Sequence, residues 1–107
     1  MDNESIEVDY TEIHKSFFKQ ADVKIVRSMT NGEEMILLYI ALMIESREHN
    51  GRLMLNDVAQ FDEEAISLVY DIDLDVVRSA FETFERFGWI EEMEDGIFLI
   101  KNQKYFR

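Results

Sequence analysis

Hydrophobic residues recur at steps of three and four through much of the chain, which is the spacing of amphipathic helices. The clearest case is the segment 74–87, and Gly88 follows it where a left-handed residue commonly ends a helix. An earlier segment, 57–70, has the same periodicity, and Asn56 and Asp62 are both suitable N-caps for it. The pattern therefore predicts two helices in succession, joined by a short turn.

The first third of the chain is also predicted to be helical. Residues 10–29 have broadly helical spacing that is interrupted near Gln20, which fits one kinked helix or two short ones. Thr30 and Glu33 then stand at the spacing of a capping box, in which each side chain bonds the other's backbone amide. We therefore expect a helix to begin there and to run to about Glu48.

The remaining segments favour extended structure. Asn50-Gly51 is a turn signal, and residues 52–55 are predicted to form a short strand. Residues 89–93 and 97–100 flank Asp95-Gly96, a pair suited to a type I′ hairpin turn. Helices, a short strand, two helices and a hairpin, in that order, predict a mostly α fold with a small β-hairpin, a winged helix-turn-helix whose wing pairs with the short strand.

The stretch from Met35 to Ile44 is apolar on every side of the predicted helix, which leaves two alternatives open. Such a helix can lie at the centre of the core. It can also share part of its surface with a second copy, and the candidate residues for that contact are Met35, Leu38, Tyr39, Leu42 and Met43.

Composition limits the domain organisation and the environment. A chain of 107 residues has room for one core. Residues 1–9 contain too few apolar side chains to order themselves and are predicted to be a mobile tail, so that 10–107 form one winged-helix domain. The absence of cysteine excludes disulfides and thiolate metal sites and suits a reducing cytoplasm. The longest apolar run has ten residues, about half of the roughly 20 that cross a membrane.

Charge is strongly uneven along the sequence. The chain has 11 basic and 23 acidic residues, a net charge of −12, and residues 30–100 alone carry −13. Four of the basic residues lie within 30–100, and the other seven lie near the two ends of the chain: Lys15, Lys19, Lys24, Arg27, Lys101, Lys104 and Arg107. If the ends of the chain meet in space, these seven residues form the basic patch of the domain.

The predicted recognition helix and wing are acidic, although a winged helix normally reads DNA with that helix. The exposed positions of the helix are predicted to be Asp75, Arg78, Ser79, Glu82, Glu85 and Arg86. Phosphates repel such a surface, so we interpret it as solvated or as binding protein rather than duplex DNA. The candidate acidic partner-binding face is Glu82, Glu85, Glu91, Glu92, Glu94 and Asp95.

The candidate basic contact patch lies in the N-terminal helical region and consists of Lys15, Lys19, Lys24 and Arg27. One interpretation is a solvated helix face on which lysine stems cover apolar surface. The other is contact with nucleic acid or with an acidic protein surface, including the acidic half of another copy of this domain.

No arrangement of residues indicates catalysis. His14 and His49 are separated by 35 positions without ligand spacing, and each of the four glycines stands at an element boundary instead of in a phosphate-binding loop. The acidic pairs are typical of solvated charge. We therefore expect a protein that is not an enzyme and that uses no metal or other cofactor.

Several short segments resemble one known family across residues 10–102, nearly the whole chain. They are Phe17-Phe18, Ile25-Val26-Arg27, Gly32 before the apolar helix, Asn50-Gly51-Arg52-Leu53, and Phe87-Gly88-Trp89-Ile90-Glu91. They look like the N-terminal domain of phage replisome organisers and are more distantly similar to that of DnaD-type primosomal proteins. The resemblance implies a winged-helix module that self-associates and helps to assemble the replication machinery at an origin, in a chain that normally continues into a second domain.

Two functions follow as hypotheses. The first is a non-enzymatic interaction and oligomerisation module of DNA replication initiation, with a protein of the replication machinery as its partner. The alternative is a small acidic phage-encoded inhibitor that mimics nucleic acid and occupies a basic channel of a host or defence protein. The alternative is motivated by the −13 segment, which the first hypothesis does not explain.

Overall fold

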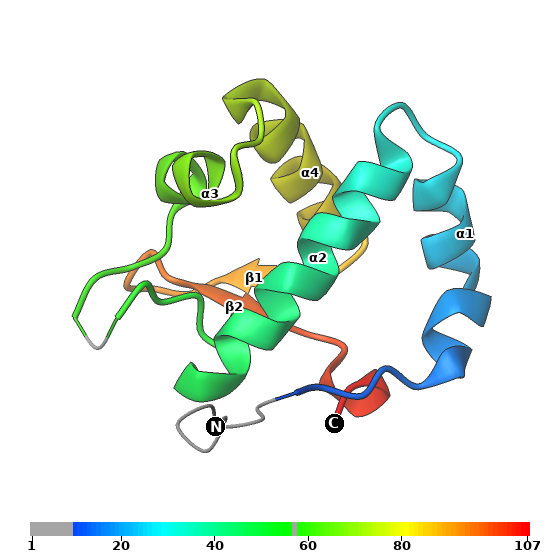
Figure 1. Ribbon diagram of the computed structural model, residues 1–107, viewed down its shortest axis with the longest axis horizontal. Helices are drawn as coiled ribbons and strands as arrows, with labels where there is room; N and C mark the ends of the chain where they lie inside the picture. The colour runs from blue at the N-terminus through cyan, green and yellow to red at the C-terminus, as the bar shows by residue number, and fades with distance from the viewer. Residues whose placement is uncertain (1–9, 57) are drawn as a thin grey trace, which may run out of the picture.

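The computed structural model describes residues 10–56 and 58–107, so the tail predicted at 1–9 lies outside the described residues. Within the described part, four α-helices and one antiparallel hairpin make up the fold (Figure 1). The α-helices are α1 (Ala21–Arg27), α2 (Gly32–Ser46), α3 (Glu63–Tyr70) and α4 (Leu74–Arg86), and the strands are β1 (Ile90–Glu92) and β2 (Phe98–Ile100). Short 3₁₀ helices are η2 (Lys15–Lys19), η3 (Arg47–His49) and η4 (Gln103–Tyr105). The predicted winged helix-turn-helix is confirmed.

The N-terminal region forms two short helices, η2 and α1, which separate at Gln20 as the interrupted periodicity allowed. The predicted capping box is wrong. Asn31, with a φ of 59°, is the N-cap of α2, and its side chain makes no capping bond. Glu33 instead forms an ion pair with Arg27 at 3.3 Å.

Gly32 explains why α2 begins where it does. A Cβ atom at this position would lie 2.0 Å from the carbonyl oxygen of Val26 and 2.8 Å from that of Arg27. Only glycine permits so close an approach to the end of α1. The turn between α1 and α2 is therefore fixed by backbone contact instead of by the predicted side-chain cap.

Helix α3 begins later than predicted, at Glu63 instead of near 57. The Asp62 carboxylate accepts the amide of Ala65 at 2.9 Å and caps the helix. Asn56 binds the amides of Val58 and Ala59 and so closes a local turn. Short polar side chains such as that of Asn56 can bond nearby backbone amides in a turn, and such a turn competes with helix formation.

Helix α4 agrees with its prediction. It spans 74–86, Phe87 is its C-cap, and Gly88 has a φ of 74°. Asp73 is the N-cap residue, although its side chain makes no capping bond.

The wing is the predicted hairpin, with Ile90 opposite Ile100 and Glu92 opposite Phe98. Its turn is not type I′, because only Gly96, with a φ of 85°, has a positive φ. The Gly96 amide donates to the carbonyl of Met93 at 2.9 Å, which fits a type I turn followed by a glycine bulge.

The predicted strand at 52–55 is reduced to isolated bridges. Leu53 donates its amide to Phe98 at 2.9 Å, and Arg52 pairs with Leu99. The segment thus adds to the wing as expected, but over too few residues to form a strand.

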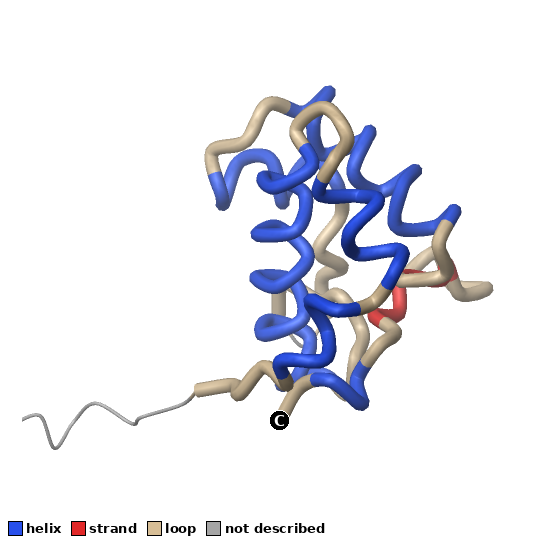
Figure 2. Tube along the Cα trace, turned by 90° about the vertical axis from the view of Figure 1, so that its right-hand side faces the viewer, coloured by secondary structure: helices blue, strands red, loops and turns tan. Residues whose placement is uncertain are grey.

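The core lies between α2, α4, the wing and the N-terminal helices. Figure 2 shows helices forming most of the structure, with the strands confined to one edge. Tyr39 and Trp89, at 0% and 1% exposure, pack with ring centroids 5.0 Å apart. The Tyr39 hydroxyl lies 3.0 Å from the carbonyl oxygens of Trp89 and Lys101 and accepts a bond from Asn102, so one buried side chain joins α2 to both ends of the wing.

Candidate functional site

The two ends of the described chain lie side by side and form a junction. The backbone groups of Glu12 and Arg107 bond each other in both directions, and the amide of His14 donates to Tyr105 at 2.7 Å. Ile13 and Phe106 form an antiparallel bridge between them. The condition stated from the sequence, that the ends of the chain meet in space, is therefore fulfilled (Figure 1).

Aromatic side chains hold this junction against the core. Phe17 is fully buried, and its ring lies 5.2 Å from that of Phe106 and 6.0 Å from that of Tyr105. His14 caps the N-terminus of η2, because its Nδ1 accepts a hydrogen bond from the backbone amide of Ser16. The 3₁₀ helix η4 was not predicted; Asn102, which precedes it with a φ of 62°, is its one local signal.

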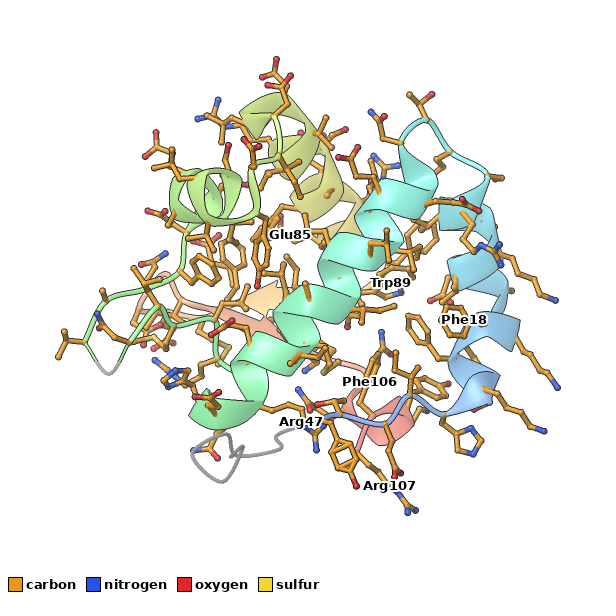
Figure 3. The ribbon with its side chains drawn as sticks, in the orientation of Figure 1. Phe18, Arg47, Glu85, Trp89, Phe106 and Arg107 are labelled. Carbon is orange, nitrogen blue, oxygen red and sulfur yellow. The ribbon has the colours of Figure 1, made fainter. Side chains whose placement is uncertain are left out.

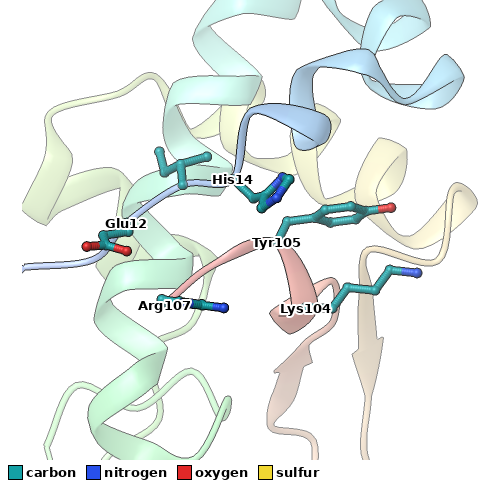
Figure 4. A pocket seen from close by; sticks show the side chains of 6 residues that line it. Glu12, His14, Lys104, Tyr105 and Arg107 are labelled. Carbon is teal, nitrogen blue, oxygen red and sulfur yellow. The ribbon is translucent and has the colours of Figure 1, made fainter.

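A hollow of about 330 Å³ opens at the junction (Figure 4). It is lined by Glu12, Ile13, His14, Lys104, Tyr105 and Arg107. The ammonium group of Lys104 lies 5.2 Å from the centre of the Tyr105 ring, a distance at which a cation is attracted to the ring face. The hollow combines cations with aromatic surface, but only one acidic side chain lines it.

The predicted basic residues divide into two groups around this hollow. Lys15 and Lys19 lie on η2, and this helix packs against η4, which carries Lys104. Lys24 and Arg27 lie farther along, on α1, and Arg27 is paired with a glutamate. The four predicted residues thus lie on two elements, and η2, with Lys15 and Lys19, is the one that packs against the C-terminal helix η4.

The predicted acidic face is fully on the surface, as are the six expected exposed positions of α4. All of its members are exposed: Glu82, Glu85, Glu91, Glu92, Glu94 and Asp95. Two ion pairs with basic residues reduce its charge, Arg52–Asp95 at 2.7 Å and Lys101–Glu91 at 3.1 Å. The guanidinium of Arg52, followed by the amide of Ile97, lowers the pKa of Asp95.

The residues predicted for self-association are not on the surface. Met35, Leu38, Tyr39, Leu42 and Met43 are 0–3% exposed and belong to the core, so they offer no surface to a partner. Helical periodicity could not show which side of an all-apolar helix faces out. The exposed or half-exposed apolar positions of α2 are Leu37, Ile40, Ala41 and Ile44.

Within the part of the chain that the structure describes, no three histidine, cysteine, aspartate or glutamate side chains converge to hold a metal ion. None of the helices found there has both the length and the apolar character to cross a bilayer.

Comparison with known proteins gives one match. Residues 10–107 match the model of a family described as N-terminal phage replisome organiser. A comparison with curated proteins and one with solved structures each found no significant match. The match covers the whole winged-helix domain described above, and it supports a role related to replication.

Proposed function

We propose, since the chain belongs to the N-terminal phage replisome organiser family, that this domain is a non-enzymatic interaction and oligomerisation module of DNA replication initiation. Its contacts are with protein: a component of the replication machinery, or another copy of itself. Membership of this family supports a role related to DNA replication, and the charge of the domain surface supports contacts with protein.

The observation that carries the proposal is the charge of the winged face. The exposed side of α4 has three acids and two bases, and the hairpin that follows carries four exposed acids. Arg52 and Lys101 form ion pairs with two of these four acids, so they offset only part of the negative charge of the hairpin. Since neutralisation of phosphates supplies most non-specific DNA affinity, this face would repel a duplex that entered along α4.

The junction of the chain ends offers a second, opposite surface. Lys104 and Arg107 line its hollow and Lys15 and Lys19 lie on the adjoining η2, while the acids gather on α3, α4 and the wing. A molecule with one basic and one acidic pole can be drawn to copies of itself or to charged partners in a preferred orientation. This polarity favours an assembly role over a solitary one.

Fluorescence anisotropy with a labelled duplex at 0.15 M salt tests the proposal. We expect no saturable binding of the wild-type chain at micromolar concentration. A variant with Glu91, Glu92, Glu94 and Asp95 changed to lysine is the positive control, because it keeps an exposed wing while reversing its sign. It should gain duplex affinity. Saturable binding of the wild-type chain at or below micromolar concentration would overturn the proposal.

A further inference from the structure

The outward face of α2 is apolar through its middle. Leu37 is 69% exposed and Ile44 is 45% exposed, with the half-buried Ile40 and Ala41 between them. Surface helices normally place polar residues on this side. We call these four residues the α2 stripe.

Leu37 forms a ridge between two grooves. One groove is lined by Phe18, Arg27, Glu33, Ile36 and Ile40, together with Leu37 itself. The other is lined by Glu34, Leu38, Ala41, Tyr70 and Ile72, again with Leu37. With a ridge beside a groove, two copies of this helix face can interlock, because the ridge of each copy can pack into a groove of the other.

The charges on the two sides of the stripe are opposite. Residues 15–27, in η2 and α1, carry four bases and one acid, and that acid, Asp22, is turned inward to bind Trp89. Residues 62–75, from the N-cap of α3 to the start of α4, carry six acids and no base. Figure 3 shows this division, with nitrogen-tipped side chains beyond α1 and oxygen-tipped ones around α3 and the start of α4.

We propose that the α2 stripe binds the α2 stripe of a second copy, with the basic side of each copy against the acidic side of the other. A two-fold axis parallel to α2 produces this arrangement, because it superposes the stripes and exchanges the flanks. The two contacts between a basic and an acidic side, which we call the flank junctions, are equivalent in an isologous interface, and both are attractive. This inference rests on the proposed function and specifies which surface performs it.

The flanks are needed for area as well as for charge. Helix α2 has 15 residues and is about 22 Å long, so the stripe alone is a narrow strip. A stable interface buries about 800 Å² on each partner. The flanking elements η2, α1 and α3 extend the contact on either side of the stripe, so the charged flanks contribute much of the area.

Substitution of the ridge is the first test. Sedimentation velocity over a wide range of protein concentration should show self-association of the wild-type chain that Leu37→Glu weakens at least tenfold. Val58→Glu is the matched control, because Val58 is 89% exposed and lies in the loop before α3. It should associate like the wild type. Circular dichroism of the three chains checks that each is folded.

Charge exchange is the second test, and it is independent of the ridge. One variant carries Lys19→Glu and Lys24→Glu, and the other carries Glu34→Lys, in the groove beside Tyr70, and Asp73→Lys, in the acidic segment 62–75. Each variant alone places like charges opposite each other at the substituted positions and should associate more weakly than the wild type. An equimolar mixture restores opposite charges at both junctions and should recover most of the wild-type association.

The outcomes separate this inference from the function on which it rests. Self-association that Leu37→Glu leaves unchanged, or a mixture no stronger than its components, overturns the α2 interface and leaves the interaction role standing. A wild-type chain that stays monomeric overturns the α2 interface and the oligomerisation part of the function together. Duplex binding by the wild-type chain overturns the function whatever Leu37→Glu does.

Discussion

The indole nitrogen of Trp89 donates a hydrogen bond to the carboxylate of Asp22 across 2.8 Å. The two residues are 67 positions apart, one at the start of α1 and the other at the start of the wing. Trp89 is 1% exposed, so its polar atom has no access to water as a substitute partner. This bond ties the N-terminal helices, which carry the basic residues, to the winged half of the domain.

Asp22→Ala should lower the free energy of unfolding by about 1–3 kcal/mol, because the buried indole N–H loses its acceptor. Asp22→Asn keeps an oxygen acceptor and should cost less. Urea denaturation followed by tryptophan fluorescence measures both. Equal losses in the two variants would show that the hydrogen bond does not matter.

Gly32→Ala should be among the more damaging single changes, at about 2 kcal/mol or more, since the added Cβ would collide with backbone that cannot move freely. Glu33→Ala, at the exposed neighbour, should cost less than about 1 kcal/mol even though it removes the ion pair with Arg27. Thermal unfolding of the two variants compares them. A mild effect at Gly32 would contradict the close packing of α1 on α2.

The helix caps give a paired prediction. Asp62→Ala should cost about 1 kcal/mol, because its carboxylate caps α3. Thr30→Ala should change stability by less than about 0.5 kcal/mol, because α2 does not use Thr30 as a cap. Denaturant unfolding tests both variants, and a larger loss at Thr30 than at Asp62 would restore the capping box.

Asp95 should titrate below its ordinary pKa of 3.8, because the folded state favours its charged form through Arg52. The stabilisation is present above pH 4 and is lost as the pH falls through the lowered pKa. Carboxyl NMR titration of Asp95 measures this. Arg52→Met should move the midpoint upward, although the amide of Ile97 keeps part of the shift. A midpoint that does not move would contradict the ion pair.

The elements that could be predicted from the sequence are those whose structure is determined by residues within the element itself. Helix α4 and the wing depend on local periodicity and on turn glycines, and both lie where they were expected. The start of α2 was missed because the backbone approach at Gly32, and not a local cap, determines it. The start of α3 was missed because Asn56 closes a turn of its own instead of capping the helix.

The candidate surfaces were predictable to different degrees. The exposure of the acidic face was predicted correctly, because charged residues remain on the surface wherever the chain folds. The meeting of the two ends could be stated only as a condition, because no pattern within either end predicts its pairing with the other. The apolar surface was assigned to the wrong side of α2. Leu37 and Leu38 are adjacent and chemically identical, yet they are 69% and 3% exposed, and only the packing of neighbouring elements distinguishes them.

The pairing of residues 12–14 with 105–107 also has a mechanical consequence. Glu12 and Arg107 stand opposite each other, so tension applied to the two ends pulls across the hydrogen bonds and loads them one at a time, as in unzipping. Each bond adds little resistance alone. Traction from an attached segment or a partner would therefore open the pairing from Glu12 and Arg107 inward while the buried Phe17 still holds η2, so the hollow lined by His14 and Lys104 would be lost first and the rest of the domain would stay folded.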